Sequence, residues 1–158
     1  MRLKLYHFVL VTFLLTIFSC KKERPTISNT LTIKTEKGVN ATFKYSSATS
    51  QIANTFRVIF QQTDTLQDIT IAPFIDNLNY GVISLSAPSL GVGTYDSTTY
   101  PGQLIFAYET SNWGPPTSYF MSITFTNYNP HGRITGSALR KDINGNIVET
   151  ATFDFTLN

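Results

Sequence analysis

The sequence predicts an all-β protein, and we expect an antiparallel β-sandwich of about nine strands. Short runs of β-branched and aromatic residues alternate with Gly, Pro, Asn and Asp from Leu31 to Leu157, a pattern typical of many short strands. Polar and apolar residues alternate with a period of two in several runs, and no segment of this region shows convincing helical periodicity. An up-and-down, lipocalin-like β-barrel is the alternative architecture, because about eight antiparallel strands also close into a barrel.

The expected strands are regularly spaced along the chain. They cover residues 31–35, 41–46, 55–61, 69–74, 81–86, 103–110, 119–126, 133–141 and 148–157. Alternation predicts four stripes of side chains that face the core: Ala151, Phe153, Phe155 and Leu157; Met121, Ile123 and Phe125; Leu104, Phe106 and Tyr108; and Phe56, Val58 and Phe60. Between the last two strands, the Asn144-Gly145 pair predicts a hairpin turn, since Gly supports a positive φ there.

The first part of the chain is predicted to be an export signal. Arg2 and Lys4 precede an apolar run over residues 6–19, which is shorter than the ~20 residues needed to cross a membrane. The run ends in Ile17-Phe18-Ser19-Cys20, which resembles a bacterial lipobox and implies lipidation of Cys20, the single cysteine. We therefore expect a lipoprotein signal peptide at 1–19, a lipidated tether at 20–29 and one β-domain at 30–158. The alternatives are an ordinary secretory signal peptide cut near Ser19 and, less favoured, an uncleaved anchor.

The charge balance argues against a nucleic-acid partner. Without Arg2 and Lys4 the chain has ten basic and ten acidic residues, and from Thr30 onward it has seven basic and nine acidic ones. Nucleic-acid binding requires a basic face, which this balance does not provide. Three basic residues instead stand beside Cys20, where each adds about 1 kcal/mol of attraction to an anionic surface. The partner expected on this side is the membrane, reached through the lipid on Cys20.

The C-terminal half resembles a known group of proteins over residues 80–157. The segments that carry the resemblance are Gly81-Val82-Ile83-Ser84-Leu85, Gly93-Thr94-Tyr95-Asp96, Met121-Ser122-Ile123-Thr124-Phe125, Arg133-Ile134-Thr135-Gly136-Ser137 and Ala151-Thr152-Phe153-Asp154-Phe155. Their order is similar to that in a family of uncharacterised Bacteroidota lipoproteins with a C-terminal all-β domain. The resemblance implies a place in the cell envelope at the outer membrane, and it implies no reaction. Many lipoproteins of that group are surface-displayed when acidic residues follow the cysteine; only Glu23 does here, so periplasmic and surface orientations both stay open.

Candidate catalytic and metal-binding patterns are few. His131, in the loop after Asn129, is the one histidine beyond the leader, which excludes a histidine-rich zinc site, and no Gly-x-Ser-x-Gly elbow is present. The acids Asp64, Asp68, Asp76 and Asp96 are expected mostly in turns, where hydrogen bonding to the local backbone explains them. We expect no catalytic residue, although the spacing of a carboxylate pair for glycoside hydrolysis is not visible in a sequence.

Two further patterns resemble binding motifs, one for calcium and one for nucleotides, but neither fits its motif. Asp142, Asn144 and Asn146 alternate as in a calcium loop, but Gly145 is misplaced for such a loop and the hairpin explains the pattern. Gly91-Val92-Gly93 leads into a further expected strand at Thr94-Tyr95 and not into a helix, which disfavours nucleotide binding. No metal or cofactor is therefore expected.

Aromatic residues near turns are the candidate binding residues. Trp113 lies in a loop with Gly114, Pro115 and Pro116, and an exposed indole there would stack on a sugar or insert into a partner. The tyrosines that would extend this surface are Tyr95, Tyr100, Tyr119 and Tyr128. The alternative is that Trp113 folds back and plugs the open end of the domain.

Two short segments are candidates for covalent modification. Asp64-Thr65-Leu66 and Asp96-Ser97-Thr98 resemble the O-glycosylation acceptors of Bacteroidota, with Thr65 and Ser97 as the modified residues.

Together these patterns predict an envelope lipoprotein with a non-catalytic β-domain that binds a glycan or an envelope protein. Thr and Tyr side chains on the solvent-facing sides of the strands supply hydrogen-bonding groups for either partner. A lipocalin-like carrier of a small apolar ligand is the first alternative. A hydrolase that uses a carboxylate pair is the second.

Overall fold

The computed structural model describes residues 28–47, 52–75, 78–79, 81–108 and 119–157. All regular structure in these residues is β-strand, so the all-β prediction is confirmed. Within the same residues, no helix has the length and apolar character needed to span a membrane. The strands are β1 (Thr30–Thr35), β2 (Asn40–Tyr45), β3 (Thr55–Gln62), β4 (Gln67–Ile75), β5 (Leu78–Asn79), β6 (Gly81–Ala87), β7 (Gly93–Asp96), β8 (Leu104–Tyr108), β9 (Phe120–Tyr128), β10 (Arg133–Lys141) and β11 (Ile147–Thr156).

Each of the nine expected ranges corresponds to one of these strands, with ends that agree to within about two residues where they are described. The expected range 133–141 agrees with β10 at both ends. The structure adds β5, which is two residues long and pairs with β4, and it forms β7 where the further strand is expected near Thr94.

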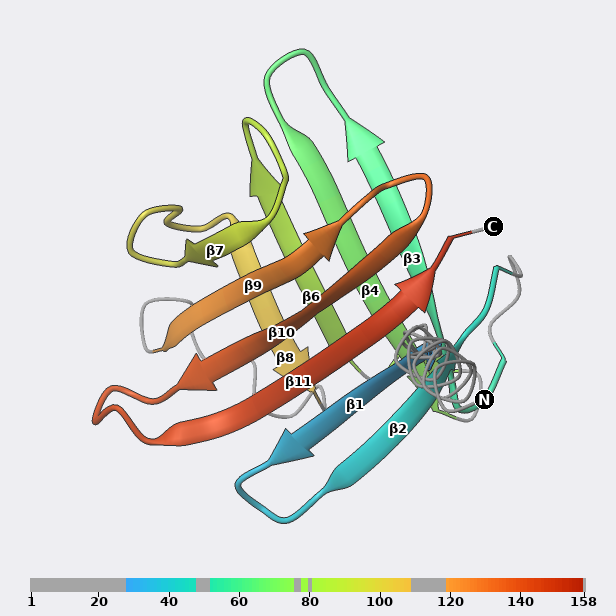
Figure 1. Cartoon of the computed structure of the whole chain (residues 1–158). Coiled ribbons are helices and arrows are strands. Elements are labelled where there is room, and N and C mark those ends of the chain that lie inside the picture. Colours follow the sequence, from blue (N-terminus) through green and yellow to red (C-terminus); the bar gives the residue numbers. More distant parts are fainter. Residues whose placement is uncertain (1–27, 48–51, 76–77, 80, 109–118, 158) are drawn as a thin grey trace, which may run out of the picture.

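All the strands belong to one sheet, in the order β7-β9-β10-β11-β1-β2-β3-β4-β6-β8, with β5 beside β4. The sheet curls back on itself, and Figure 1 shows β9, β10 and β11 crossing in front of β4, β6 and β8. One continuous, nearly closed sheet fits the barrel alternative better than a sandwich, which has two separate sheets. The connections are not up-and-down, however, because β7 leaves its sequence neighbours to pair with β9.

A short parallel pairing of β2 with β3 joins the half of the sheet that runs from β7 to β2 to the half that runs from β3 to β8. β2 and β3 pair only at Lys44 with Thr55 and at Tyr45 with Phe56, whereas the other neighbouring strands are antiparallel. β8 is the last strand in the sheet order, and it approaches β9 from the other end of the sheet. There the Phe106 N–H of β8 donates a hydrogen bond to Met121 Sδ of β9 at 3.3 Å. A side-chain contact therefore joins β8 to β9.

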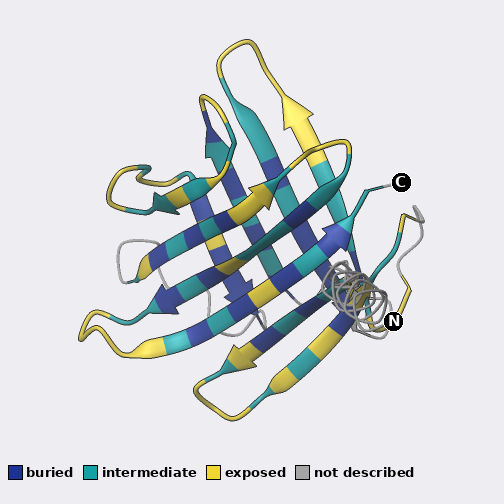
Figure 2. Ribbon diagram, viewed as in Figure 1, coloured by how far each residue is buried: buried dark blue, intermediate teal, exposed yellow. Residues whose placement is uncertain are grey.

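Aromatic and aliphatic side chains fill the interior of the sheet. Figure 2 shows buried residues alternating with intermediate or exposed ones along β9 and β11, as expected for strands with one face toward the core. Aromatic rings from different strands meet inside: the Phe56 and Phe155 centroids lie 5.4 Å apart, and those of Phe125 and Phe153 lie 5.8 Å apart. Three of the four predicted stripes are confirmed, apart from Leu157, which is only partly buried.

The prediction for Phe60 is wrong. Phe56 is fully buried and Val58 is partly buried, but Phe60 is 36% exposed. The reason is geometric: β2 pairs only with the first two residues of β3, so the far end of β3, where Phe60 lies, has a neighbouring strand on the β4 side only.

The hairpin between β10 and β11 is confirmed. Gly145 has a φ of 86°, and its N–H donates to the Asp142 carbonyl at 3.0 Å. The Asp142 carboxylate accepts hydrogen bonds from the Asn146 side-chain amide and from the N–H groups of Asn144 and Asn146, and these bonds lower the pKa of Asp142. The turn therefore explains the alternating polar residues that resemble a calcium loop.

Candidate functional site

A cleft of about 530 Å³ lies between three connecting segments at one end of the sheet. In Figure 1 these segments gather at the top of the view. The β3–β4 hairpin contributes Phe60, Gln61, Gln62, Gln67 and Asp68; the segment after β6 contributes Leu90 and Gly91; and the end of β9 with the turn that follows contributes Tyr128, Pro130 and His131. The volume lies within the range of ~300–1,000 Å³ that is usual for small-molecule sites.

The cleft combines flat apolar surface with hydrogen-bonding groups. Phe60 is 36% exposed and, with Tyr128, supplies aromatic surface. Three glutamines supply amide donors and acceptors, and charge is sparse, since Asp68 is the one carboxylate among the described residues that line the cleft. Asp68 Oδ1 is buried and has no hydrogen-bond partner among the described residues. A buried acceptor of this kind gains stability when a ligand brings a donor to it.

Side-chain hydrogen bonds hold the 88–92 segment against the rest of the cleft. Gln67 Oε1 accepts a hydrogen bond from the Leu90 N–H at 2.9 Å, which links this segment to β4. The Tyr95 hydroxyl accepts one from the Gly91 N–H, also at 2.9 Å, which links it to β7. Gln67 and Tyr95 therefore position one wall of the cleft.

The other two walls are tight turns with their own hydrogen bonds. In the β3–β4 turn, Thr63 Oγ1 accepts from the Leu66 N–H at 3.0 Å. In the β9–β10 turn, Asn129 Oδ1 accepts from the His131 N–H at 3.0 Å, and the Asn129 carbonyl accepts from Gly132. All three walls thus have fixed backbones, and the cleft is formed without a ligand, as is usual for binding sites.

Aromatic packing connects the cleft to β7. Ring centroids lie 5.5 Å apart for Tyr100 and Tyr95, 6.0 Å for Tyr95 and Phe125, and 5.0 Å for Phe125 and Tyr128. Burial of Tyr128, with a smaller contribution from Tyr95, raises the pKa of the Tyr128 hydroxyl. The hydroxyl therefore stays protonated, and able to donate a hydrogen bond, beyond the usual range of tyrosine.

The structure brings three of the four predicted tyrosines together. Tyr128 lines the cleft, Tyr95 holds its wall, and Tyr100 packs behind Tyr95. Tyr119 lies at the opposite end of β9 from Tyr128, so these two residues do not share one surface.

Tyr119 instead packs against a buried ion pair of Arg140 and Glu149. The Arg140 guanidinium carbon lies 4.5 Å from the centroid of the Tyr119 ring, and Arg140 Nη2 lies 3.0 Å from Glu149 Oε1. Arg140 is 3% exposed and Glu149 is 2% exposed. Such a buried ion pair is a structural element, and it faces the core near the β10–β11 hairpin.

The remaining predicted residues divide into two groups. Cys20 and Trp113 lie outside the described residues. Of the two candidate O-glycosylation residues, Thr65 is exposed at the tip of the β3–β4 hairpin, whereas Ser97 is half-buried and its Oγ accepts a hydrogen bond from the Met121 N–H at 3.1 Å. The environment of Thr65 is therefore the more accessible of the two.

Sequence reasoning missed most of the cleft. Asp68 was expected in a turn but lies on β4, and His131 was interpreted only as a turn residue. One local signal was available, namely Phe60 followed by Gln61 and Gln62, where an apolar stripe gives way to amides before the turn. Among the described residues, no group of three or more His, Cys, Asp or Glu is placed to hold a metal ion.

Comparison of the chain with protein-family models, with curated proteins and with solved structures gives no match. The fold and the site therefore define the class directly. It is an all-β protein with one nearly closed sheet and a preformed cleft at one end.

Proposed function

We propose that the chain is a bacterial envelope lipoprotein whose non-catalytic β-domain binds a glycan in the cleft between the β3–β4 hairpin, the 88–92 segment and the β9–β10 turn. The observation that carries this proposal is the lining: two aromatic side chains beside three glutamines and little charge. Aromatic rings offer flat apolar surface to the faces of sugar rings, and amides donate to and accept from sugar hydroxyl groups.

The anchor rests on the sequence. Lipidation of Cys20 and cleavage before it would hold the domain at an envelope membrane, with the outer membrane favoured by the resemblance to Bacteroidota lipoproteins. The domain then faces either the periplasm or the cell exterior. An envelope protein is the alternative partner to a glycan.

A carrier of small apolar ligands is less well supported than glycan binding. Such carriers hold their ligand inside the barrel, whereas here the interior is filled by core side chains that include Phe43, Phe106 and Phe125. A carboxylate hydrolase is likewise less well supported, because glycoside hydrolysis of the usual type uses two carboxyl groups and Asp68 is the one acid among the described residues that line the cleft.

Two phenylalanines of nearly equal exposure allow a matched test. Phe60 in the cleft is 36% exposed, and Phe120 at the far end of β9 is 38% exposed. We expect a neutral oligosaccharide, selected on a glycan array and titrated by calorimetry, to bind the wild type and the Phe120→Ala variant equally. The Phe60→Ala variant should bind about two- to twelvefold more weakly, since loss of one ring contact costs ~0.5–1.5 kcal/mol.

Three outcomes of this titration would contradict the proposal in different ways. No binding of any neutral glycan would remove it. Equal binding by both variants would place the site elsewhere on the domain. Binding of a fatty acid in place of a glycan would favour the carrier.

A further inference from the structure

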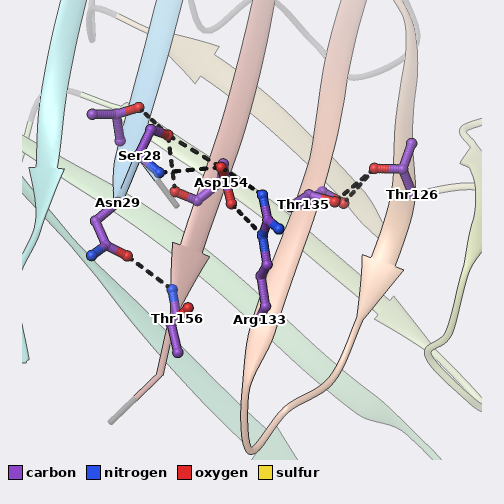
Figure 3. Close-up of polar contacts among 8 residues, drawn as sticks. Ser28, Asn29, Thr126, Arg133, Thr135, Asp154 and Thr156 are labelled. Carbon is purple, nitrogen blue, oxygen red and sulfur yellow. Dashed lines mark hydrogen bonds and ion pairs between the residues drawn. The ribbon is translucent and has the colours of Figure 1, made fainter. Parts of the chain in front are cut away.

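Side-chain hydrogen bonds fasten the chain just before β1 to the end of β11. Asp154 Oδ2 accepts from the Ser28 N–H at 3.2 Å, and Asn29 Oδ1 accepts from the Thr156 N–H at 3.0 Å (Figure 3). Arg133 holds the same carboxylate through two bonds of 2.9 and 3.0 Å. We call Ser28, Asn29, Arg133, Asp154 and Thr156 the tether clamp.

The backbone of Asn29 strengthens the tether clamp. Its φ of 51° is left-handed, which turns the chain sharply at this point. Its carbonyl accepts a hydrogen bond from the Tyr45 N–H at 2.8 Å, so Asn29 is held by β2 as well as by β11. The point at which the chain enters the domain is therefore fixed.

The tether clamp lies beside one wall of the cleft, the β9–β10 turn. The Leu157 N–H, next to Thr156 of the clamp, donates to the Gly132 carbonyl at 2.9 Å, and Gly132 follows the cleft residue His131. Arg133 of the clamp is the first residue of β10, directly after the turn that forms this wall of the cleft. The β10–β11 hairpin, in contrast, lies at the other end of β11, a strand of ten residues that is about 33 Å long.

The chain between Cys20 and the clamp is short. Eight residue steps separate Cys20 from Ser28, and they span at most about 29 Å when fully extended. Lys21, Lys22 and Arg24 lie within this segment and attract it to an anionic membrane surface. An anchor at Cys20 therefore holds the clamp within about 29 Å of the lipid headgroups, and attraction of these basic residues to the membrane surface shortens that distance.

We propose that the cleft faces the anchoring membrane and binds the saccharide headgroup of a membrane glycolipid, in preference to a soluble glycan. This inference rests on the proposed function, both for the lipid on Cys20 and for a glycan in the cleft. The clamp fixes the point at which the tether leaves the domain, and the β9–β10 wall of the cleft lies beside that point. The ligand and the anchor then share one membrane surface, which raises the effective concentration of the ligand.

Orientation is tested on the lipidated protein in vesicles of phosphatidylcholine and phosphatidylglycerol. Single cysteines at two exposed positions, His131→Cys beside the cleft and Asn144→Cys in the far hairpin, carry a donor fluorophore, with an acceptor on lipid headgroups. We expect at least twofold greater energy transfer from position 131 than from position 144. Equal or reversed transfer, in protein that floats with the vesicles, overturns the inference. Protein that does not float contradicts the anchor itself.

The ligand is tested with a photoreactive galactosyl diacylglycerol in the same vesicles. We expect crosslinking to the wild type and to Phe120→Ala, and about a two- to twelvefold loss in Phe60→Ala. Binding of a soluble neutral oligosaccharide without crosslinking to the glycolipid overturns this inference and leaves the proposed function intact. Absence of both overturns the proposed function.

Discussion

Two arginine–carboxylate pairs join β10 to β11, one of them buried and the other partly exposed. In the inner pair, Arg140 Nη2 lies 3.0 Å from Glu149 Oε1, and the side chains are 4% and 3% exposed. In the outer pair, Arg133 Nε lies 2.9 Å from Asp154 Oδ1, and the side chains are 27% and 24% exposed. A buried and a partly exposed ion pair can thus be compared within one pair of strands.

We predict that Glu149→Gln lowers the free energy of unfolding by about 3–5 kcal/mol, because it leaves the Arg140 charge buried without its carboxylate. The contact of Arg140 with the Tyr119 ring limits this loss. Asp154→Asn removes a charge that water already screens, so its cost is about 1 kcal/mol. Replacing both members of the inner pair with apolar residues, as in Arg140→Met with Glu149→Leu, should recover most of the stability.

Urea denaturation followed by circular dichroism gives the free energy of unfolding of the wild type and the three variants. In a thermal melt, a cost of 3–5 kcal/mol lowers the melting temperature of a domain of this size by roughly 10 °C. Equal losses for Glu149→Gln and Asp154→Asn would refute the argument from burial. A double variant no more stable than Glu149→Gln alone would show that the pair contributes more than charge compensation.

Three other predictions follow from particular contacts. Gly136→Ala should cost ~1–3 kcal/mol in the same denaturation assay, because a Cβ there would overlap the backbone of a neighbouring strand; an unchanged midpoint would contradict this. Hydrogen bonds from Arg133, with smaller ones from Ser28, lower the pKa of Asp154, so their stabilisation is present above pH ~3.9 and is lost as the pH falls through the folded-state pKa. The wild type should therefore lose more stability in acid than Asp154→Asn. Parallel curves of unfolding free energy against pH for the two proteins would contradict this prediction. Peptide mass mapping of protein from the native host should find any O-glycan on Thr65 before Ser97, whereas a glycan on Ser97 alone would reverse the order inferred from exposure.

Local patterns predicted the strands, because each strand needs only its own alternation of polar and apolar side chains. Residues 133–141 and the turn at Asn144-Gly145 were predicted in this way, and the structure confirms both. The curling of all strands into one sheet was not predictable, because it depends on the two-residue parallel contact between β2 and β3. Nothing in the sequence of either strand distinguishes a parallel neighbour from an antiparallel one.

The cleft was harder to predict than the fold, because its walls come from three segments that are distant in the sequence. Tyr128 was a candidate for its position near a turn, but Phe60 was assigned to the core by its place in an alternating stripe. The alternation was correct, and the error lay in assuming that cover continues along the whole strand. Length of overlap between strands is a tertiary property, so Phe60 becomes a cleft residue only in the folded sheet.

The position of β1 between β2 and β11 affects how the protein folds. Thr30 pairs with Asp154, so the first strand of the sheet needs the last strand as its partner. Pairing of residues so far apart in sequence slows folding, because a long loop must close first. During synthesis from the N-terminus, one edge of β1 stays open until β11 has been made. The chain therefore completes its sheet late, which suits a protein that crosses a membrane unfolded, as the export we propose requires.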